Sequence, residues 1–192
     1  MNGPVKERII VALSGSSAPH YGVRLLEVLK PMEGVETHAI VSRGARATIA
    51  HELDRDPESV AELADVIHDE HNLAASIASG TFITNGMVVA PCSIKTLSAV
   101  ANSFNDNLIA RAADVCLKER RRLVLVVRES PLHGGHLQLM LRATEMGAVI
   151  LPPVPAFYHR PASLAELIDH TITKILDQLG IDAGLIERWE GI

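Results

Sequence analysis

Residues able to bind phosphate and to carry protons occur in short polar clusters that each follow an apolar run. The pair Arg128-Glu129 directly follows the apolar run 123–127. Arginine offers a two-pronged donor for phosphate, and a glutamate can accept or donate a proton. A buried strand seldom ends in two opposite charges unless they pair with each other or face a site. The pair therefore predicts either a structural ion pair or a phosphate-handling site.

Two further clusters have the composition of anion-binding turns. Ser14-Gly-Ser-Ser17 follows the apolar run 8–13, and Ser93-Ile-Lys-Thr96 follows Pro91-Cys92. Small residues let the backbone approach a phosphate, and a helix that starts there offers free N–H groups. An ordinary turn with a serine cap would have the same composition, so both interpretations stay open at this point.

Other catalytic patterns are incomplete or missing. A dinucleotide-binding G-x-G-x-x-G motif would need more than Gly15 and Gly22, and no Walker motif occurs. Cys92 has no neighbouring base that would make it a nucleophile. His133 and His136 lie three residues apart without a carboxylate pattern, so no metal site is predicted.

The elements that must position these clusters alternate between short β-branched runs and longer helical patterns. Strands are predicted at 8–13, 36–41, 66–67, 86–90, 123–127 and 148–151, with Pro91 ending the fourth. Helices are predicted at 21–30, 45–53, 57–64, 94–101, 107–119, 137–146 and 163–179, the last between Ser163 and Gly180 as its caps. Buried strands separated by helices predict an α/β fold: a single, three-layered, Rossmann-like (flavodoxin-like), doubly wound parallel sheet spanning residues 1–192.

In such sheets ligands bind beyond the carboxyl ends of the strands. Five polar clusters follow predicted strands, and we therefore expect a pocket at that edge. The clusters are Ser14-Gly-Ser-Ser17, Ser42-Arg-Gly44, Pro91-Cys-Ser-Ile-Lys-Thr96, Arg128-Glu-Ser-Pro131 and Pro152-Pro-Val-Pro-Ala-Phe-Tyr158.

The amino-acid composition limits which classes of partner and which cellular compartment are expected. The chain has 18 Lys and Arg against 23 Asp and Glu, a net charge of −5, so it lacks the basic excess that nucleic acid binding requires. No apolar run approaches the roughly 20 residues of a membrane helix. Two cysteines are too few for a disulfide framework. We expect a cytoplasmic protein that binds neither nucleic acid nor membrane.

Motifs spread over residues 8–189 resemble those of the UbiX-type flavin prenyltransferases, which bind FMN and belong to a wider flavoprotein group. The matching segments are Ser14-Gly-Ser-Ser-Ala-Pro-His-Tyr-Gly-Val-Arg-Leu-Leu26, Ala78-Ser-Gly80, Gly86-Met-Val-Val-Ala-Pro-Cys-Ser-Ile-Lys-Thr-Leu97, Arg111-Ala-Ala-Asp-Val115, Leu117-Lys-Glu-Arg-Arg121, Val126-Val-Arg-Glu129, Pro155-Ala-Phe-Tyr158, Ile175-Leu-Asp177 and Leu179-Gly-Ile181.

This resemblance implies a reaction and its partners. Reduced FMN would attack dimethylallyl phosphate through flavin N5 and release phosphate, and a second bond to flavin C6 would close a fourth ring. The prenylated FMN would then serve a UbiD-type decarboxylase. The resemblance also implies no metal requirement and a homo-oligomer, a dodecamer, with sites at subunit junctions.

The resemblance further assigns roles to residues of this chain. The implied FMN-binding residues are Gly15, Ser16, Ser17, Ser42, Ser93, Ile94, Lys95, Thr96 and Arg128. The implied prenyl-phosphate ligands are Lys118, Arg128, Tyr158 and Lys174. The implied catalytic residues are Ser17, near flavin N5, and the proton carriers Glu129 and Glu52.

The chain departs from the family pattern at three positions. Ala18 replaces a loop glycine, Leu73 stands where some members have tryptophan, and Leu139 replaces a common asparagine. Two other functions stay open. One is an FMN-dependent decarboxylase of peptidyl-cysteine type, although Lys95 replaces the asparagine of that group. The other is an FMN-binding accessory subunit of an aromatic-acid decarboxylase that performs no prenyl transfer.

Overall fold

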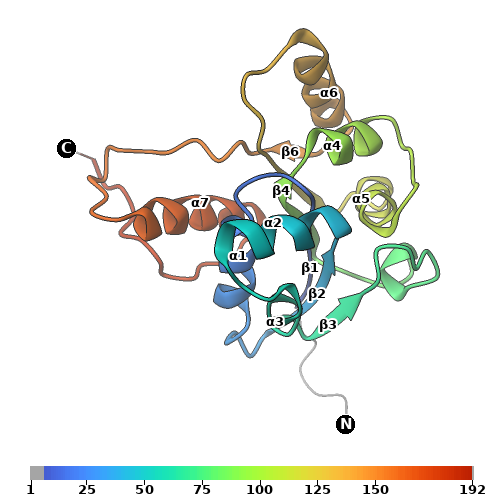
Figure 1. Ribbon diagram of the computed structural model, residues 1–192, viewed down its shortest axis with the longest axis horizontal. Coiled ribbons are helices and arrows are strands. Elements are labelled where there is room, and N and C mark those ends of the chain that lie inside the picture. Colours follow the sequence, from blue (N-terminus) through green and yellow to red (C-terminus); the bar gives the residue numbers. More distant parts are fainter. Residues whose placement is uncertain (1–6, 192) are drawn as a thin grey trace.

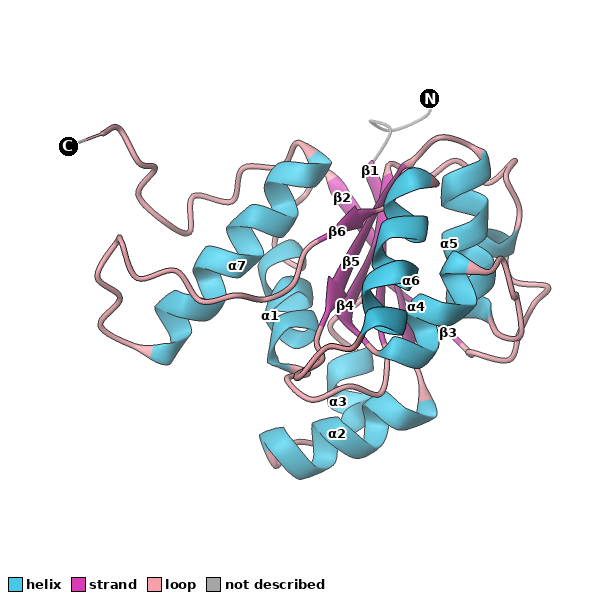
Figure 2. Ribbon diagram, turned by 90° about the horizontal axis from the view of Figure 1, so that it is seen from above, coloured by secondary structure: helices cyan, strands magenta, loops and turns pink. Residues whose placement is uncertain are grey.

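A computed structural model describes residues 7–191, and within them the chain forms a six-stranded, all-parallel sheet (Figures 1 and 2). Residues 1–6 and 192 of the predicted domain lie outside the described part. The strands are β1 (Glu7–Leu13), β2 (Val35–Val41), β3 (Val66–His68), β4 (Gly86–Cys92), β5 (Arg122–Val127) and β6 (Val149–Ile150). The helices are α1 (His20–Leu29), α2 (Arg43–Leu53), α3 (Pro57–Ala61), α4 (Ile94–Ala101), α5 (Leu108–Lys118), α6 (Gly134–Glu145) and α7 (Leu164–Leu179), with a 3-10 turn at Ser76–Ala78.

The strand order β3-β2-β1-β4-β5-β6 confirms the predicted doubly wound sheet. The order reverses between β1 and β4, and in this fold the ligand crevice opens at such a reversal. Figure 2 shows α1 and α7 on one face of the sheet and α4, α5 and α6 on the other. The site is therefore expected where the loops after β1 and β4 meet.

The alternation of side chains along β1 explains the three layers. Ile9, Val11 and Leu13 pack with the core on the α1 and α7 face, whereas Ile10 and Ala12 pack with the core on the α4 and α5 face. Successive side chains of a strand point to opposite faces, so a strand covered on both sides is apolar throughout. This is why the predicted strands are continuous apolar runs.

Helix caps explain where several elements begin. Ser42 accepts a hydrogen bond from the Ala45 N–H, so α2 starts at Arg43, two residues before the prediction. The His133 side chain accepts from the Gly135 N–H, so α6 starts at Gly134, three residues before its prediction. Ser163 and Gly180 cap α7 as predicted.

Two element ends were also predicted wrongly. Strand β4 does not stop at Pro91 but continues to Cys92. Its pairing with β5 is irregular between Val89 and Cys92, and a proline is tolerated at such an irregularity because no ladder N–H is needed there. Helix α3 ends at Ala61 instead of residue 64. No helix within residues 7–191 combines the length and apolar character needed to cross a membrane.

Candidate active site

Ser14 joins the carboxyl ends of β1 and β4, the two strands at the reversal of strand order. Its hydroxyl donates to the Pro91 carbonyl at 2.9 Å and accepts from the Ser93 N–H at 2.8 Å. The side chain is buried, with 2% of its surface exposed. Sequence reasoning placed Ser14 in a polar cluster but assigned it no role. A serine at the end of an apolar strand was the available signal, because a buried hydroxyl requires hydrogen-bond partners.

The loops after β1 and β2 touch through their backbones. A Cβ atom on Gly15 would lie 2.8 Å from the Gly44 Cα, and a Cβ on Gly44 would lie 2.9 Å from the Gly15 Cα. Both distances are shorter than carbon atoms tolerate, so glycine is required at both positions. Because neither glycine has a side chain, the main-chain groups of this turn are accessible. A phosphate or a flavin ring can therefore approach them closely.

The first loop is also held by a carboxylate from α2. Glu52 accepts hydrogen bonds from the Ser17 hydroxyl at 3.1 Å and from the Ala18 N–H at 2.8 Å. Ala18 has a φ of +68°, in the left-handed region that favours glycine. The backbone at this departure from the family pattern thus has the conformation of a glycine, with Glu52 bound to its N–H.

Arg128 and Glu129 stand at the same edge, after β5. The Arg128 N–H donates to the Cys92 carbonyl at 3.2 Å, and its own carbonyl accepts from the Ser16 hydroxyl at 2.7 Å. Both side chains are exposed, and Glu129 accepts from the Ser130 N–H. Within the described chain they form no ion pair with each other, which leaves both side chains available to a ligand.

The start of α4 contributes backbone groups to the edge. Ser93 caps the helix by accepting from the Thr96 N–H, and its hydroxyl donates to the Thr96 hydroxyl at 3.2 Å. The first N–H groups of a helix have no partner inside it and remain free for an anion. The Lys95 side chain is 79% exposed and lies 3.9 Å from Asp106. The side chain of Lys95 is thus paired with Asp106, and its backbone N–H in the first turn of α4 is a group that can bind a ligand at the edge.

The cysteines contribute no nucleophile. Burial raises the pKa of the Cys92 thiol to about 12 and that of Cys116 to about 11. A thiol attacks as thiolate, and at neutral pH these two are protonated.

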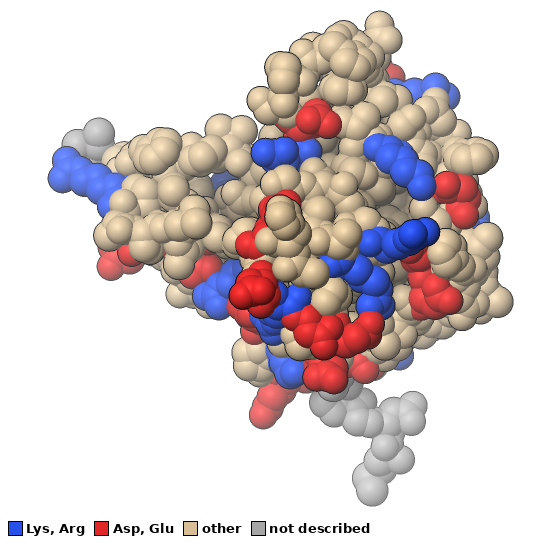
Figure 3. All heavy atoms as spheres, viewed as in Figure 1, with Lys and Arg blue, Asp and Glu red and all other residues tan. Residues whose placement is uncertain are grey.

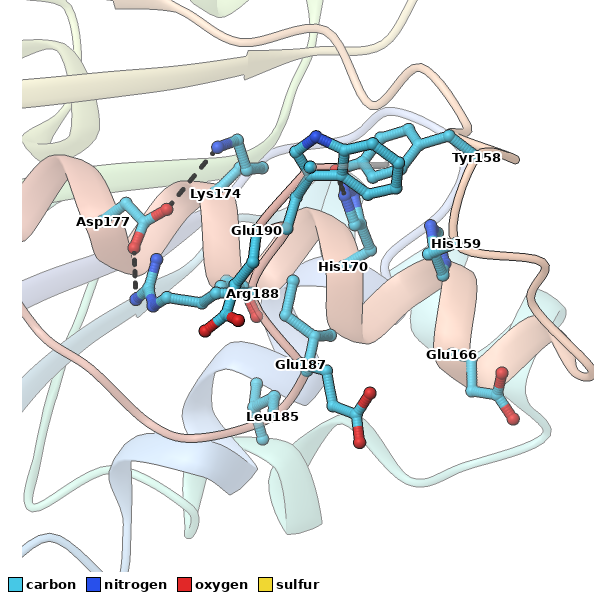
Figure 4. A pocket seen from close by; sticks show the side chains of 14 residues that line it. Tyr158, His159, Glu166, His170, Lys174, Asp177, Leu185, Glu187, Arg188 and Glu190 are labelled. Carbon is cyan, nitrogen blue, oxygen red and sulfur yellow. Dashed lines mark hydrogen bonds and ion pairs between the residues drawn. The ribbon is translucent and has the colours of Figure 1, made fainter.

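The predicted ligands Tyr158 and Lys174 lie elsewhere, beside a cavity of about 710 Å³ between α7 and the C-terminal tail (Figure 4). The Tyr158 hydroxyl is 2.8 Å from His170 Nε2. Lys174 pairs with Asp177 at 3.6 Å, and Arg188 of the tail binds the same carboxylate at 2.9 Å. Because the Asp177 carboxylate pairs with both Arg188 and Lys174, it balances only part of their positive charge. Lys174 therefore presents net positive charge to the cavity.

The prediction that all five polar clusters meet at one edge is therefore wrong for the fifth. After β6 the chain runs outward as an extended arm, residues 151–163, before it returns as α7 (Figure 1). Pro152, Pro153 and Pro155 supply no N–H groups for a turn or a helix, so the chain continues extended past the edge. Tyr158 lies on this arm and is therefore not at the carboxyl edge of its own chain.

Lys118 occupies a third place. It is the last residue of α5, directly before the loop that enters β5 at its amino end. The side chain pairs with Glu119, and both lie next to Gly80. Because Arg128 follows the carboxyl end of β5, the full strand separates Lys118 from Arg128 in one chain. One chain thus distributes its predicted phosphate ligands over three places.

No group of three or more His, Cys, Asp or Glu side chains within residues 7–191 is arranged to hold a metal ion. The rings of His133 and His136, at the start of α6, lie beside Lys95 of α4, with centroids 3.7 Å apart and an angle of 36° between their planes. His170 is the residue beside the predicted ligands that sequence reasoning missed. Its spacing of four from Lys174, which places both on one face of α7, was the available signal.

Comparison with known proteins gives consistent matches. A family model described as Flavoprotein matches residues 3–177. The flavin prenyltransferase UbiX of Thauera aromatica is 57% identical over 184 residues, covering 96% of this chain and 94% of the relative.

Two solved structures match nearly the whole chain. A UbiX crystal structure in complex with FMN and dimethylallyl pyrophosphate superposes with a TM-score of 0.95 at 48% identity, covering 97% of this chain and 99% of that one. The dodecameric FMN-dependent Ubix-like decarboxylase of Escherichia coli O157:H7 superposes with a TM-score of 0.94 at 43% identity, covering 96% and 100%.

Proposed function

The chain belongs to the Flavoprotein family and is one of its flavin prenyltransferases, and from this membership we infer which residues carry each part of the reaction. The enzyme transfers a dimethylallyl group to FMN, and the donor that we propose is dimethylallyl phosphate. This reaction takes the place of the two alternatives that the sequence left open. When bound, reduced FMN supplies the nucleophilic N5 and C6 atoms.

The carboxyl edge of the sheet fits FMN. The bare turn at Gly15 and Gly44 offers backbone N–H groups without a side chain between them and the ligand. Hydroxyl groups follow the carboxyl ends of β1, β2 and β4, in the loops that form this edge. They belong to Ser16, Ser17, Ser42, Ser93 and Thr96. The N-terminus of α4, with Ile94 and Lys95 in its first turn, adds free N–H groups for an anion. These residues are the FMN site that we propose.

Arg128 and Glu129 take the chemical roles at this edge. The bond between the allylic carbon and the phosphate oxygen breaks, and the phosphate leaves with the electron pair. A cation near that growing charge lowers the barrier. Two hydrogen bonds fix the Arg128 backbone at this edge, and its exposed guanidinium is free to take that role. Glu129 accepts the proton that the flavin ring loses. Glu52 holds Ser17 in place and is the second candidate for that proton.

Tyr158, Lys174 and Lys118 complete the phosphate site from other copies of the chain. The observation that carries this proposal is the separation of the four phosphate ligands over three places in one chain. The arm that bears Tyr158 also exposes Val154 and Phe157, with 72% and 68% of their surfaces accessible. Exposed apolar side chains on one segment indicate a protein interface.

A second uncharged surface supports assembly. Figure 3 shows few charged side chains over α6, and Leu132, Leu137 and Leu141 are exposed there. We therefore propose a closed homo-oligomer, a dodecamer, in which the arm of one copy reaches the carboxyl edge of another. We also propose that it works in the cytoplasm, where free thiols such as Cys92 and Cys116 stay reduced. The prenylated flavin would pass to a UbiD-type decarboxylase.

Co-expression of two inactive variants tests the shared site. Lys118→Ala and Arg128→Ala each remove one phosphate ligand, so each variant alone should lose most prenyl transfer. If the two residues act in one site but come from different copies, random mixing restores both to about a quarter of the sites. Co-expressed Lys118→Ala and Arg128→Ala chains should regain activity in that proportion. A mixture as inactive as its parents would contradict the shared site. The matched control is co-expression of Arg128→Ala with Glu129→Gln, which are neighbours in one chain, with the ring-closed flavin as the measured product in both mixtures; this control should show no recovery, because Glu129→Gln does not close the ring.

A further inference from the structure

His170 lies between the two proposed phosphate ligands of the α7 cavity. Tyr158 lies on the extended arm and Lys174 on α7, so no shared helix or strand fixes the position of one relative to the other. The Tyr158 hydroxyl lies 2.8 Å from His170 Nε2, and His170 precedes Lys174 by four residues on the same face of α7 (Figure 4). His170 is 7% exposed, whereas Tyr158 is 57% exposed. The buried histidine thus fixes an exposed tyrosine next to a lysine.

We propose that His170 is a positioning residue of the prenyl-phosphate subsite: its Nε2–H donates to the Tyr158 oxygen and thereby directs the hydroxyl proton of Tyr158 toward the phosphate. The proposal rests on the function proposed above, because it takes the ligand of Tyr158 and Lys174 to be the phosphate of the donor. It adds a role for a residue that touches the ligand only through Tyr158.

The direction of the hydrogen bond decides what the tyrosine offers. A phenol has one proton and can donate it once. If Tyr158 donated to His170, its oxygen lone pairs would face the phosphate and repel it. If His170 donates to Tyr158, the phenol proton is free, and a hydrogen bond to a charged phosphate is stronger than one to a neutral nitrogen. A bound anion therefore favours the His170 tautomer that carries its proton on Nε2.

The surroundings of His170 keep its ring neutral and its plane fixed. Burial, and then repulsion from His159 and Lys174, lowers the pKa of His170 below its usual range. The ring of His159 stacks on that of His170, with centroids 4.7 Å apart and an angle of 3° between the planes. The His159 ring on one face of the imidazole and the attachment of His170 to α7 hold the ring with its Nε2 toward Tyr158. His170 consequently contributes orientation, and the positive charge of the subsite comes from Lys174.

The test is a double-mutant cycle read by binding. Dimethylallyl phosphate is titrated calorimetrically into assembled protein loaded with oxidised FMN, which lacks the nucleophile and keeps the donor intact. His170→Leu should weaken binding about tenfold, the size of one lost hydrogen bond. His170→Gln, whose amide N–H reaches to a similar point, should recover most of that loss. In a Tyr158→Phe background, His170→Leu should cost less than about twofold, because no hydroxyl remains to be oriented.

Equal losses from His170→Leu in both backgrounds, or a loss from His170→Gln as large as that from His170→Leu, would overturn the proposal. Thermal unfolding and FMN affinity of each variant report whether the fold and the flavin site are intact, and both should match the wild type. Single-turnover prenyl transfer by the wild type is measured alongside. A wild type that binds the donor with the predicted coupling but transfers no prenyl group would contradict the proposed function and leave the role of His170 standing.

Discussion

The Glu52 carboxylate of α2 accepts a hydrogen bond from the Ser17 hydroxyl of the first loop at 3.1 Å. The same carboxylate oxygen accepts from the Ala18 N–H at 2.8 Å. Two residues that the family resemblance assigned to catalysis are therefore in direct contact. The contact gives Glu52 a structural task, which is to hold the turn that faces the flavin.

Glu52→Ala should lower the affinity for FMN about tenfold, since it removes the shared acceptor of two loop donors. Glu52→Gln retains an amide oxygen for the Ala18 N–H and should lose less. Fluorescence titration of FMN measures both. Glu33→Ala, an exposed change in the turn before β2, is the matched control. An unchanged FMN affinity in Glu52→Ala would show that the loop keeps its conformation without the carboxylate.

Ala18→Gly should stabilise the protein by about 0.5–1 kcal/mol. Ala18 occupies the left-handed region, where a side chain costs roughly 1–2 kcal/mol, and the extra freedom of glycine in the unfolded chain offsets part of the gain. Ala47→Gly on the exposed side of α2 should instead destabilise by about 0.5–1 kcal/mol. Denaturant unfolding compares the two. The same sign for both substitutions would contradict the strain assigned to Ala18.

Gly22→Ala should destabilise the fold by about 3 kcal/mol through overpacking. A Cβ on Gly22 would lie 2.6 Å from the Leu13 side chain and closer still to the Ala90 carbonyl oxygen. This glycine lets α1 pack directly on β1 and β4, the strands that carry the site. Gly34→Ala, where a Cβ meets no atom within 4 Å, should change stability by less than about 0.5 kcal/mol. Equal midpoints for the two variants in urea would refute the packing argument.

Arg128→Ala should slow prenyl transfer more than Lys95→Ala. The Arg128 side chain is free to meet the departing phosphate, so its contribution grows in the transition state. The Lys95 side chain pairs with Asp106, and alanine keeps the backbone N–H in the first turn of α4. Single-turnover rates at saturating FMN decide between them. A larger loss for Lys95→Ala would reverse the assignment.

The sheet could be predicted because its strands are buried on both faces and thus appear as uninterrupted apolar runs. Short helices and loops between 54 and 84 were less clear, since exposed segments lack a periodic apolar face. Pro91 misled the prediction of β4, because an irregular pairing can absorb a proline that a regular ladder would reject.

The candidate site was predictable in its residue types more than in its geometry. Turns that follow strands can be located from the sequence, which is why Gly15, Ser93 and Arg128 meet as expected. The position of Tyr158 depends on how far a proline-rich arm extends and on a hydrogen bond to His170, and neither follows from local pattern. The separation of Lys118 from Arg128, by contrast, was implicit in the predicted strand 123–127, because Lys118 precedes that strand and Arg128 follows it.

The most direct test of prenyl transfer is the flavin itself. Purified protein is incubated anaerobically with reduced FMN and dimethylallyl phosphate, and the released flavin is examined by mass and absorbance. The account predicts a flavin that is heavier by one dimethylallyl unit and that has the absorbance of a ring-closed product. Glu129→Gln should yield the same mass with an absorbance that still lacks the fourth ring. Recovery of unmodified FMN alone from the wild type, at saturating donor, would contradict the account.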